Sequence, residues 1–252
     1  MKAGPEINRK VKIDASGIHS RDLNTHLKEI AGNGTRQVEL HNVYGQRYIG
    51  TNLNAPLEIE IHGTPGNDLG AFMDGPSITV YGNAQDGCGN TMNNGEIIVH
   101  GHAGDITGLS ARGGQIFIRD SVGYRAGIHM KEYQEKKPMV VIGGTAQDFL
   151  GEYMAGGVLL LLGLNGGGEH KARFIGTGMH GGTIYLRGNV EKYQLGSEVG
   201  IAEPGEDDWQ LVKKLVIEFA RHFKYNANEI LKGKFIKLFP LYLRPYGRIY
   251  AP

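Results

Sequence analysis

Four aspartates recur at matching places in this chain and could act as acid–base or nucleophilic carboxylates. Each comes two or three residues before a recurring glycine: Asp68, Asp86, Asp105 and Asp148. A row of carboxylates on one exposed face is what an enzyme that cleaves glycosidic bonds would need. Aspartate at such a place more often accepts hydrogen bonds from the backbone of its own turn. We therefore favour a structural role for all four and expect no catalytic residue.

The single cysteine is the other candidate nucleophile. Cys88 lies in the segment GNAQDGCGN, and no histidine occupies the matching place in the neighbouring repeats. A catalytic thiol needs a base and an orienting group close by. We therefore interpret Cys88 as a small core residue. One cysteine is also too few to hold an iron–sulfur cluster within this chain, so we expect no cofactor here.

Ten histidines could ligate a metal, but their spacing favours a different arrangement. His62 and His100 are two 19-residue repeats apart, and Tyr81 lies midway between them. Repeats that stack on one another would place these three rings in one column. The sequence has neither HExxH nor CxxC. We expect a stacked column of rings and no metal site.

Two glycine-rich segments resemble nucleotide- or anion-binding loops. Gly176–Gly181 (GTGMHG) matches G-x-G-x-x-G, but an alternating, strand-like segment follows it. The dinucleotide fingerprint requires a helix there, because the pyrophosphate binds at the helix N-terminus. We attribute this match to the repeat glycines. Gly166–Gly168 could form an anion-binding nest, although a simple loop insertion is our first interpretation.

All these residues lie in a glycine pattern with a period of 19 residues. The repeat is marked by Gly63, Gly82, Gly101, Asp120, Gly144, Gly163 and Gly188. Two longer steps contain the insertions Lys131–Lys137 and Asn165–Ala172, which we expect to form surface loops. A fixed period of this length indicates a stacked repeat architecture.

An alternating apolar pair precedes each marker, as in Ile59 and Ile61 or Ile78 and Val80. Period-two alternation predicts short strands. The chain has 40 glycines in 252 residues, roughly twice the usual share of about 7%. Glycine suits corners that need positive φ or a close approach of two backbones. We predict an all-β fold, a parallel β-solenoid of about seven coils of 19 residues. The expected structural glycines are Gly63, Gly66, Gly70, Gly82, Gly89, Gly101, Gly104, Gly108, Gly123, Gly127, Gly144, Gly151, Gly163, Gly176 and Gly188.

The flanks are expected to cover the open ends of the solenoid. We predict a helix over Ser20–Ala31, with Ser20 as its N-cap and Gly32 as its stop. Residues 37–49 read as a strand-like, irregular first coil. We thus divide the chain into an N-terminal cap (1–56), a repeat domain (57–200) and a C-terminal helical cap with a docking tail (201–252).

The C-terminal flank is expected to combine capping with docking. An amphipathic helix is predicted over Trp209–Phe223, behind the acidic pair Asp207 and Asp208, with a short helix over Asn226–Lys232. The tail from Lys234 to Pro252 is basic and aromatic, and we expect its final ~20 residues to dock onto a partner protein.

Composition narrows the possible functions. A net charge of +1 argues against nucleic-acid binding. No apolar run approaches the ~18 residues of a membrane span, and no signal peptide is expected. A single cysteine gives no reason to expect export. We expect a cytoplasmic protein.

The glycine signature G-x-x-G-x-x-x-G occurs in full as Gly63–Gly70 (GTPGNDLG) and Gly101–Gly108 (GHAGDITG), with partial copies at Gly82–Gly89 and Gly123–Gly127. It resembles the glycine-repeat domain at the C-terminal end of the glutamate synthase large subunit. The segments GNAQDGCGNTMNNGEIIVHGHAGDITGLSARGG and GEYMAGGVLLLLGL resemble the stand-alone version. The resemblance covers roughly residues 36–200.

The resemblance implies a right-handed, single-stranded parallel β-helix without catalytic residues, part of an oxidoreductase complex for glutamate synthesis. In that family one domain hydrolyses glutamine with an N-terminal cysteine, and another binds FMN and an iron–sulfur cluster and reduces 2-iminoglutarate. The β-helix holds the two in register. Met1 is not followed by a cysteine here, so the chain fits the scaffold. FMN and the cluster would belong to its partners, a glutaminase-type subunit and an FMN-containing subunit.

Several alternatives stay open. One subunit of formylmethanofuran dehydrogenase shares the glycine repeat, but the segment after Trp209 and the insertion at Lys131–Lys137 make us prefer the glutamate synthase branch. An independent β-solenoid protein acting on carbohydrate would use the aspartates named above. The sequence leaves open whether the chain forms a homo-oligomer, which face docks, and what donates electrons to the complex.

Overall fold

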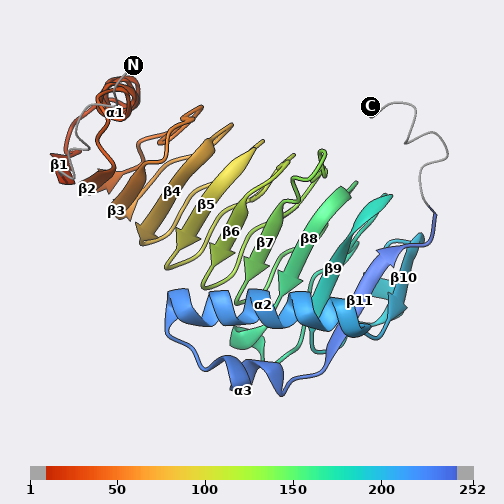
Figure 1. Cartoon of the computed structure of the whole chain (residues 1–252). Coiled ribbons are helices and arrows are strands. Elements are labelled where there is room, and N and C mark those ends of the chain that lie inside the picture. Colours follow the sequence, from red (N-terminus) through yellow and green to blue (C-terminus); the bar gives the residue numbers. More distant parts are fainter. Residues whose placement is uncertain (1–9, 243–252) are drawn as a thin grey trace.

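The computed structural model describes residues 10–242, which form one stack of coils with helices at its end and side (Figure 1). Eleven strands form one sheet in the order β1-β2-β3-β4-β5-β6-β7-β8-β9-β11-β10. The strands are β1 (Lys10–Asp14), β2 (Gln37–Tyr44), β3 (Glu58–Thr64), β4 (Asp74–Tyr81), β5 (Asn94–Val99), β6 (Gln115–Ile118), β7 (Met139–Ile142), β8 (Ala155–Leu161), β9 (Gly181–Arg187), β10 (Val199–Ala202) and β11 (Phe235–Pro240). The helices are α1 (Ser20–Gly32), α2 (Glu206–Phe223), α3 (Ala227–Leu231) and the 3₁₀ turns η1 (Leu164–Gly166) and η2 (Lys192–Gln194).

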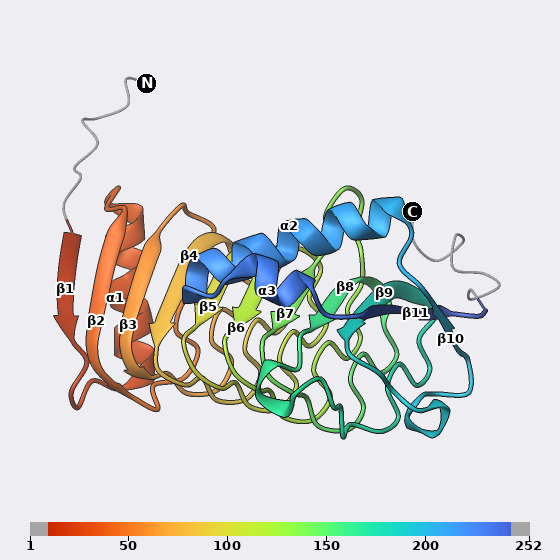
Figure 2. The same cartoon turned by 90° about the horizontal axis from the view of Figure 1, so that it is seen from below.

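The predicted parallel β-solenoid is confirmed, and so is its register. Strands β1 to β9 pair in parallel with their sequence neighbours. Ile59 lies beside Ile78, and Ile78 lies beside Ile97. Each coil contributes one strand, and the remainder of the coil returns through turns that stack beneath the sheet (Figure 2). Both insertions leave the apolar pairs of the flanking strands aligned, as for Ile116 with Val140 and Leu159 with Ile184, although β8 and β9 also have a bulge between Ala155 and Val158.

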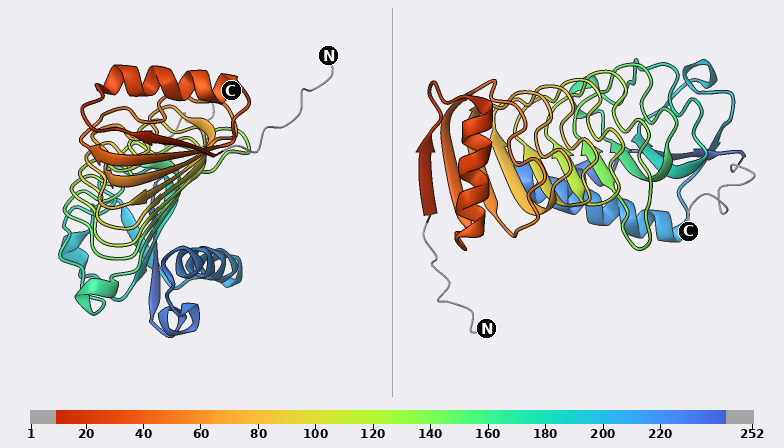
Figure 3. Two further views of the ribbon diagram at one scale, coloured as in Figure 1. Left: turned by 90° about the vertical axis from the view of Figure 1, so that its left-hand side faces the viewer. Right: turned by 90° about the horizontal axis from the view of Figure 1, so that it is seen from above.

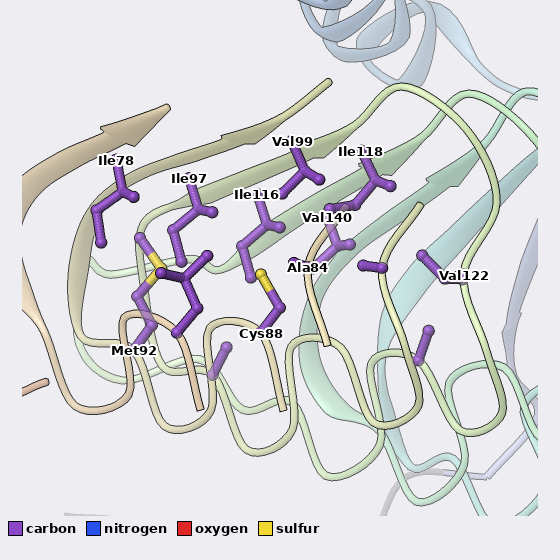
Figure 4. Packing of buried hydrophobic residues seen from close by; sticks show 14 of the residues in the cluster. Ile78, Ala84, Cys88, Met92, Ile97, Val99, Ile116, Ile118, Val122 and Val140 are labelled. Atoms are coloured by element: carbon purple, nitrogen blue, oxygen red, sulfur yellow. The ribbon is translucent and has the colours of Figure 1, made fainter. Parts of the chain in front are cut away.

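The inner core is a set of aliphatic columns. Every second residue of each strand points inward, so equivalent side chains stack from coil to coil. Figure 4 shows Ile78, Ile97, Ile116 and Val140 in one such row, facing Cys88 and other residues of the opposite turns. These side chains are at most 1% exposed. Burying one aliphatic side chain contributes about 1.5–3 kcal/mol, so the repetition itself stabilises the stack.

The repeat glycines serve the two purposes that the sequence suggests. One set has positive φ: Gly63, Gly70, Gly89, Gly108, Gly127, Gly151, Gly163, Gly176 and Gly188. At the others, an added Cβ would overlap atoms of the preceding coil: Gly66, Gly82, Gly101, Gly104, Gly123 and Gly144. Gly108 shows the first purpose: its φ is 74° and its N–H donates to the Cys88 carbonyl of the preceding coil at 2.7 Å. The glycines thus permit the close spacing of the coils.

The predicted N-terminal helix is confirmed, with a different cap. The α1 helix lies at the N-terminal end of the solenoid (Figure 3) and buries Leu23, Leu27 and Ile30 in the inner core. Its N-cap is His19, whose Nδ1 accepts from the Arg21 N–H at 3.2 Å. The hydroxyl of Ser20 instead accepts from the Arg47 N–H, at 3.0 Å. The strand β1 adds a further coil that the sequence pattern does not predict.

The structure places α2 differently from the expected end cap. The helix lies along the outer face of the sheet (Figure 3), where its side chains form a second core with residues of β5 to β9. The outward positions of these strands are apolar, which explains the location. They are Ile98, Phe117, Val141, Leu160 and Tyr185. The C-terminal end of the stack is closed by β11 and β10 instead.

The tail is partly structural. Residues 235–240, which belong to the predicted docking tail, form β11, which inserts antiparallel between β9 and β10. Residues 243–252, the end of that tail, lie outside the described residues, and their docking role stays a prediction.

Candidate functional site

The candidate aspartates hold neighbouring coils together. The Oδ1 atom of Asp86 accepts from the Asp105 N–H at 2.9 Å, and that of Asp105 accepts from the Tyr124 N–H at 2.8 Å. Asp148 accepts in the same way from the Arg173 N–H, at 2.8 Å. The sequence predicts that each aspartate caps its own turn, but these bonds run to the next coil. In a solenoid, backbone N–H groups of the next coil lie as close to such a side chain as those of its own turn.

Asp68 differs from the other three because its partner is a side chain. Its Oδ1 accepts from the Asn90 amide at 2.9 Å. Inter-coil bonds of the aspartate type also occur at Asn83, which accepts from the His102 N–H at 2.8 Å, and sequence reasoning missed this contact. Carboxylates engaged in this way do not form a pair poised for glycosidic cleavage.

Cys88 is a core residue, as interpreted from the sequence. Its side chain is 0% exposed and packs with the aliphatic rows (Figure 4). Burial raises the pKa of the Cys88 thiol to about 12. The thiol therefore stays protonated at neutral pH, whereas the nucleophilic form is the thiolate.

The predicted column of rings is confirmed and is longer than expected. His62 stacks on Tyr81 with ring centroids 4.9 Å apart, and Tyr81 stacks on His100 at 5.1 Å. His41 extends the column at one end, 4.7 Å from His62, and Phe223 of α2 meets His100 edge-on at 5.0 Å. Sequence reasoning missed His41 because the first coil has a period of 21 residues, as the pairing of Val38 with Ile59 shows.

Glu39, His41 and His62 bring their ligand atoms within 4.8 Å of one another, which makes them a metal candidate within residues 10–242. The Oε1 atom of Glu39 lies 2.7 Å from Nε2 of His41 and 3.4 Å from that of His62. The two rings are almost parallel, with an interplanar angle of 8°. A metal ion bound to histidine lies in the plane of the imidazole ring. The two rings are stacked and nearly parallel, so no position close to both Nε2 atoms lies in both ring planes.

The charge around Glu39 also disfavours a cation. Its other oxygen, Oε2, lies 2.9 Å from the Lys10 ammonium and 3.3 Å from that of Lys12. These lysines lower the pKa of Glu39 to about 2. The cluster is therefore an ion-paired network that ties β1 to β2, since opposite charges already satisfy the carboxylate.

The segment Gly176–Gly181 leads into a strand, as expected. Gly176 and Gly178 have φ angles of 68° and 71°, and β9 begins at Gly181. No helix N-terminus follows, so the geometry that binds a dinucleotide is not formed here. The other glycine-rich segment, Gly166–Gly168, ends the η1 turn and contributes Gly167 and Gly168 to the wall of a cleft.

A polar cluster fixes α2 on the sheet. The Tyr185 hydroxyl donates to Oδ1 of Asp208, and the Lys237 ammonium lies 2.9 Å from the same oxygen. Oδ2 of Asp208 also accepts from the Gly205 N–H at 2.9 Å, which caps the helix. Burial raises the pKa of Asp208, but these bonds outweigh it and the net shift is downward. The acidic start of the helix, visible in the sequence, thus orients it on β9 and β11.

Stacked aromatic side chains line one outer wall of the later coils. Phe149 stacks on Phe174 with centroids 4.9 Å apart, and the Arg125 guanidinium covers the other face of Phe149 at 5.0 Å. Beside them, His129 stacks on Tyr153 at 5.4 Å. Phe174 and Tyr153 are 46% and 47% exposed. We call these five residues the aromatic ladder; sequence reasoning missed it.

Among residues 10–242, no helix is both long and apolar enough to cross a membrane.

Two similarities to known proteins agree with the glycine motifs of the sequence. The chain is 49% identical over 253 residues to a protein of Methanocaldococcus jannaschii named "Uncharacterized protein MJ1350", and the match covers 96% of this chain and 97% of the relative. The GXGXG motif family matches residues 18–243, which include nearly the whole solenoid together with α2 and β11. The chain therefore belongs to the GXGXG motif family.

Proposed function

We propose that this chain is a non-catalytic scaffold subunit of a split glutamate synthase. It holds a glutaminase-type amidotransferase and an FMN- and iron–sulfur-containing subunit in register, so that ammonia released from glutamine reaches 2-oxoglutarate. Membership of the GXGXG motif family supports a glutamate synthase-like role. The motifs Gly63–Gly70 and Gly101–Gly108 support the same assignment by their resemblance to that enzyme's repeat domain.

The aromatic ladder is the observation that carries the scaffold role. Aromatic and arginine side chains contribute most of the binding energy in many protein interfaces. Here they are exposed on a wall held rigid by the stacked coils. A rigid surface loses little conformational entropy on binding, which favours tight association. An assembly that must keep two active sites in a fixed relation would need a surface of this kind.

The orientation of the rings favours a protein over a carbohydrate. Sugars stack on the faces of aromatic rings, but Arg125 and Phe174 cover both faces of Phe149. His129 covers one face of Tyr153, and Gly178 packs so closely against that ring that an added Cβ would overlap it. Both faces of Phe149 and one face of Tyr153 are therefore occupied within the chain, and a protein side chain can pack against the ring edges that remain.

The test is a tagged pull-down from the source organism with identification of the co-eluting chains. We expect the wild-type chain to recover a glutaminase-type subunit and an FMN oxidoreductase subunit. The variant Tyr153→Ala/Phe174→Ala should lose them. The matched control is Phe72→Ala, because Phe72 is comparably exposed, at 51%, and has a similar positive φ of 58° in the early coils.

Two results would count against the proposal. Recovery of molybdenum or tungsten enzyme subunits would favour the formylmethanofuran dehydrogenase branch. A chain that elutes alone from a fresh extract would contradict the scaffold role. Equal recovery of the partner subunits by the ladder variant and by the control would show that the partners dock somewhere other than the aromatic ladder. It would not contradict the complex itself.

A further inference from the structure

A cleft of about 680 Å³ opens on the side of the later coils, between the second insertion and the C-terminal end of the sheet. Its size lies within the range of small-molecule sites, roughly 300–1,000 Å³. Three segments that are far apart in sequence form it: the insertion after η1, the end of β9 with the following turn into η2, and the residues just before β11. The side chains used below are His170, Lys171, Arg173, Arg187 and Lys234.

Positive charge gathers in this cleft. Lys171 and Arg173 line one side, and Arg187 and Lys234 line the other, where the Gly188 N–H donates to the Lys234 carbonyl at 2.8 Å. The acidic residues of the lining are Glu169 and Glu191. Among residues 10–242, neither lysine forms an ion pair, and the contact of Arg173 with Asp148 is long, at 3.7 Å. The cations are therefore left to attract an external anion.

The walls of the cleft are held in place by hydrogen bonds, of which the two from Gln194 are buried. The Nε2–H of His170 donates to the Arg187 carbonyl at 2.9 Å. The Gln194 side-chain amide donates to the carbonyls of His170 and Ala172, at 2.6 and 2.9 Å. The Nε–H of Arg187 donates to the Ile230 carbonyl at 3.0 Å. The backbone that carries these cations is thus preorganised, which lowers the entropic cost of binding.

His170 is a buried polar residue of the same wall. Its side chain is only 7% exposed, and its Nδ1 atom is buried without a partner among the described residues. Because Nε2 carries the hydrogen, Nδ1 is an acceptor. Buried polar atoms nearly always find a partner. As a buried acceptor, Nδ1 does not itself contact an anion, so the case for an anion rests on the four cations of the lining.

We propose that this cleft binds a small dianion, a molecule that presents two carboxylates or one phosphate. Lys171 and Arg173 contact it from one side, and Arg187 and Lys234 contact it from the other. Arginine and lysine form charge-assisted hydrogen bonds with such oxygens. The proposal does not depend on the scaffold role, because it uses a different set of residues.

The test measures binding to the full-length chain by isothermal titration calorimetry, in separate titrations with inorganic phosphate and succinate at low ionic strength. The binding variant is Lys171→Ala/Lys234→Ala, which removes two exposed charges without touching the bonds that hold the walls. The matched control is Lys131→Ala/Lys214→Ala, which lowers the net charge equally at exposed positions elsewhere.

We expect saturable binding of phosphate or succinate by the wild type and the control. The binding variant should bind the same probe about tenfold more weakly or worse, since one lost charge-assisted bond changes affinity by about that factor. Absence of saturable binding for both probes would overturn the proposal. Equal weakening in the binding variant and the control would also overturn it, because net charge would then explain the effect.

Discussion

Replacing Gly127 by alanine tests whether the close stacking of coils depends on absent side chains. Gly127 has a φ of 73°. An added Cβ would lie 2.7 and 2.8 Å from the two Cδ atoms of Leu159 and 3.1 Å from its Cγ. Leu159 is 0% exposed, so its side chain cannot turn into solvent. Gly45 is the matched control, with a φ of 82° and nothing within 4 Å of an added Cβ.

The two substitutions separate two energies. Both place alanine in the left-handed region, which costs about 1 kcal/mol. Only Gly127→Ala also overpacks the core, which adds about 1–3 kcal/mol. We expect Gly45→Ala to lower the free energy of unfolding by about 1 kcal/mol, and Gly127→Ala to lower it by about 2–4 kcal/mol.

Equilibrium urea unfolding, followed by circular dichroism and by Trp209 fluorescence, measures both values. Repeat proteins can unfold in parts, so the two signals must change together before a single free energy is extracted. Trp209 is the only tryptophan and lies in α2, which makes its signal independent of the early coils. Equal destabilisation by the two variants would refute the argument, because it would leave backbone strain as the whole effect.

Three further predictions concern single side chains. Cys88 should not react with a thiol reagent at neutral pH until the chain unfolds, because burial raises its pKa to about 12; rapid reaction of the native chain would show that the core opens locally. Phe219→Ala should lower the free energy of unfolding by about 3–5 kcal/mol, because Phe219 is 0% exposed between α2 and the sheet. Ile217→Ala is the control; at a position 55% exposed, it should change the melting temperature little. Because the pKa of Glu39 is lowered from 4.5 to about 2 in the folded state, its stabilising effect is complete above about pH 4.5 and is lost as the pH falls toward 2. Glu39→Gln should flatten this acid-side dependence of stability, as melting curves across that range would show.

The strand register was predictable because two periods coincide in the sequence. Alternation within each strand fixes which side chains face inward, and the 19-residue spacing fixes which of them stack, as for Ile78 and Ile97. A slip by one residue would turn every inward side chain to the outside. The two insertions did not obscure the register, because the apolar pairs on either side of them keep their pattern.

The position of α2 was harder to predict, although part of the signal was present. An amphipathic stripe shows that a helix packs against something, but it does not identify the surface. That surface is formed by outward residues such as Phe117 and Val141. The inward apolar pairs alone do not account for these outward apolar residues. An apolar residue between the two inward positions of a strand indicates that its outer face is also covered.

The polar contacts between coils show why site residues were harder to place than strands. Asp105 bonds to the backbone 19 residues later, but Asp148 bonds to Arg173, 25 residues later. The aromatic ladder depends on the same irregular steps, since Phe149 and Phe174 stack across the second insertion. A fixed period identifies such neighbours only where no insertion has changed the spacing.

This irregularity also explains where the two candidate binding surfaces lie. In the early coils, bonds such as those of Asn83 and Asp86 engage polar side chains with the next coil. An insertion lengthens the coil beyond 19 residues and adds exposed side chains such as Lys171. The cleft is lined by the second insertion, and the aromatic ladder spans the coils that the two insertions connect. The uniform coils thus supply rigidity, while the interrupted coils present side chains that a partner or ligand can contact.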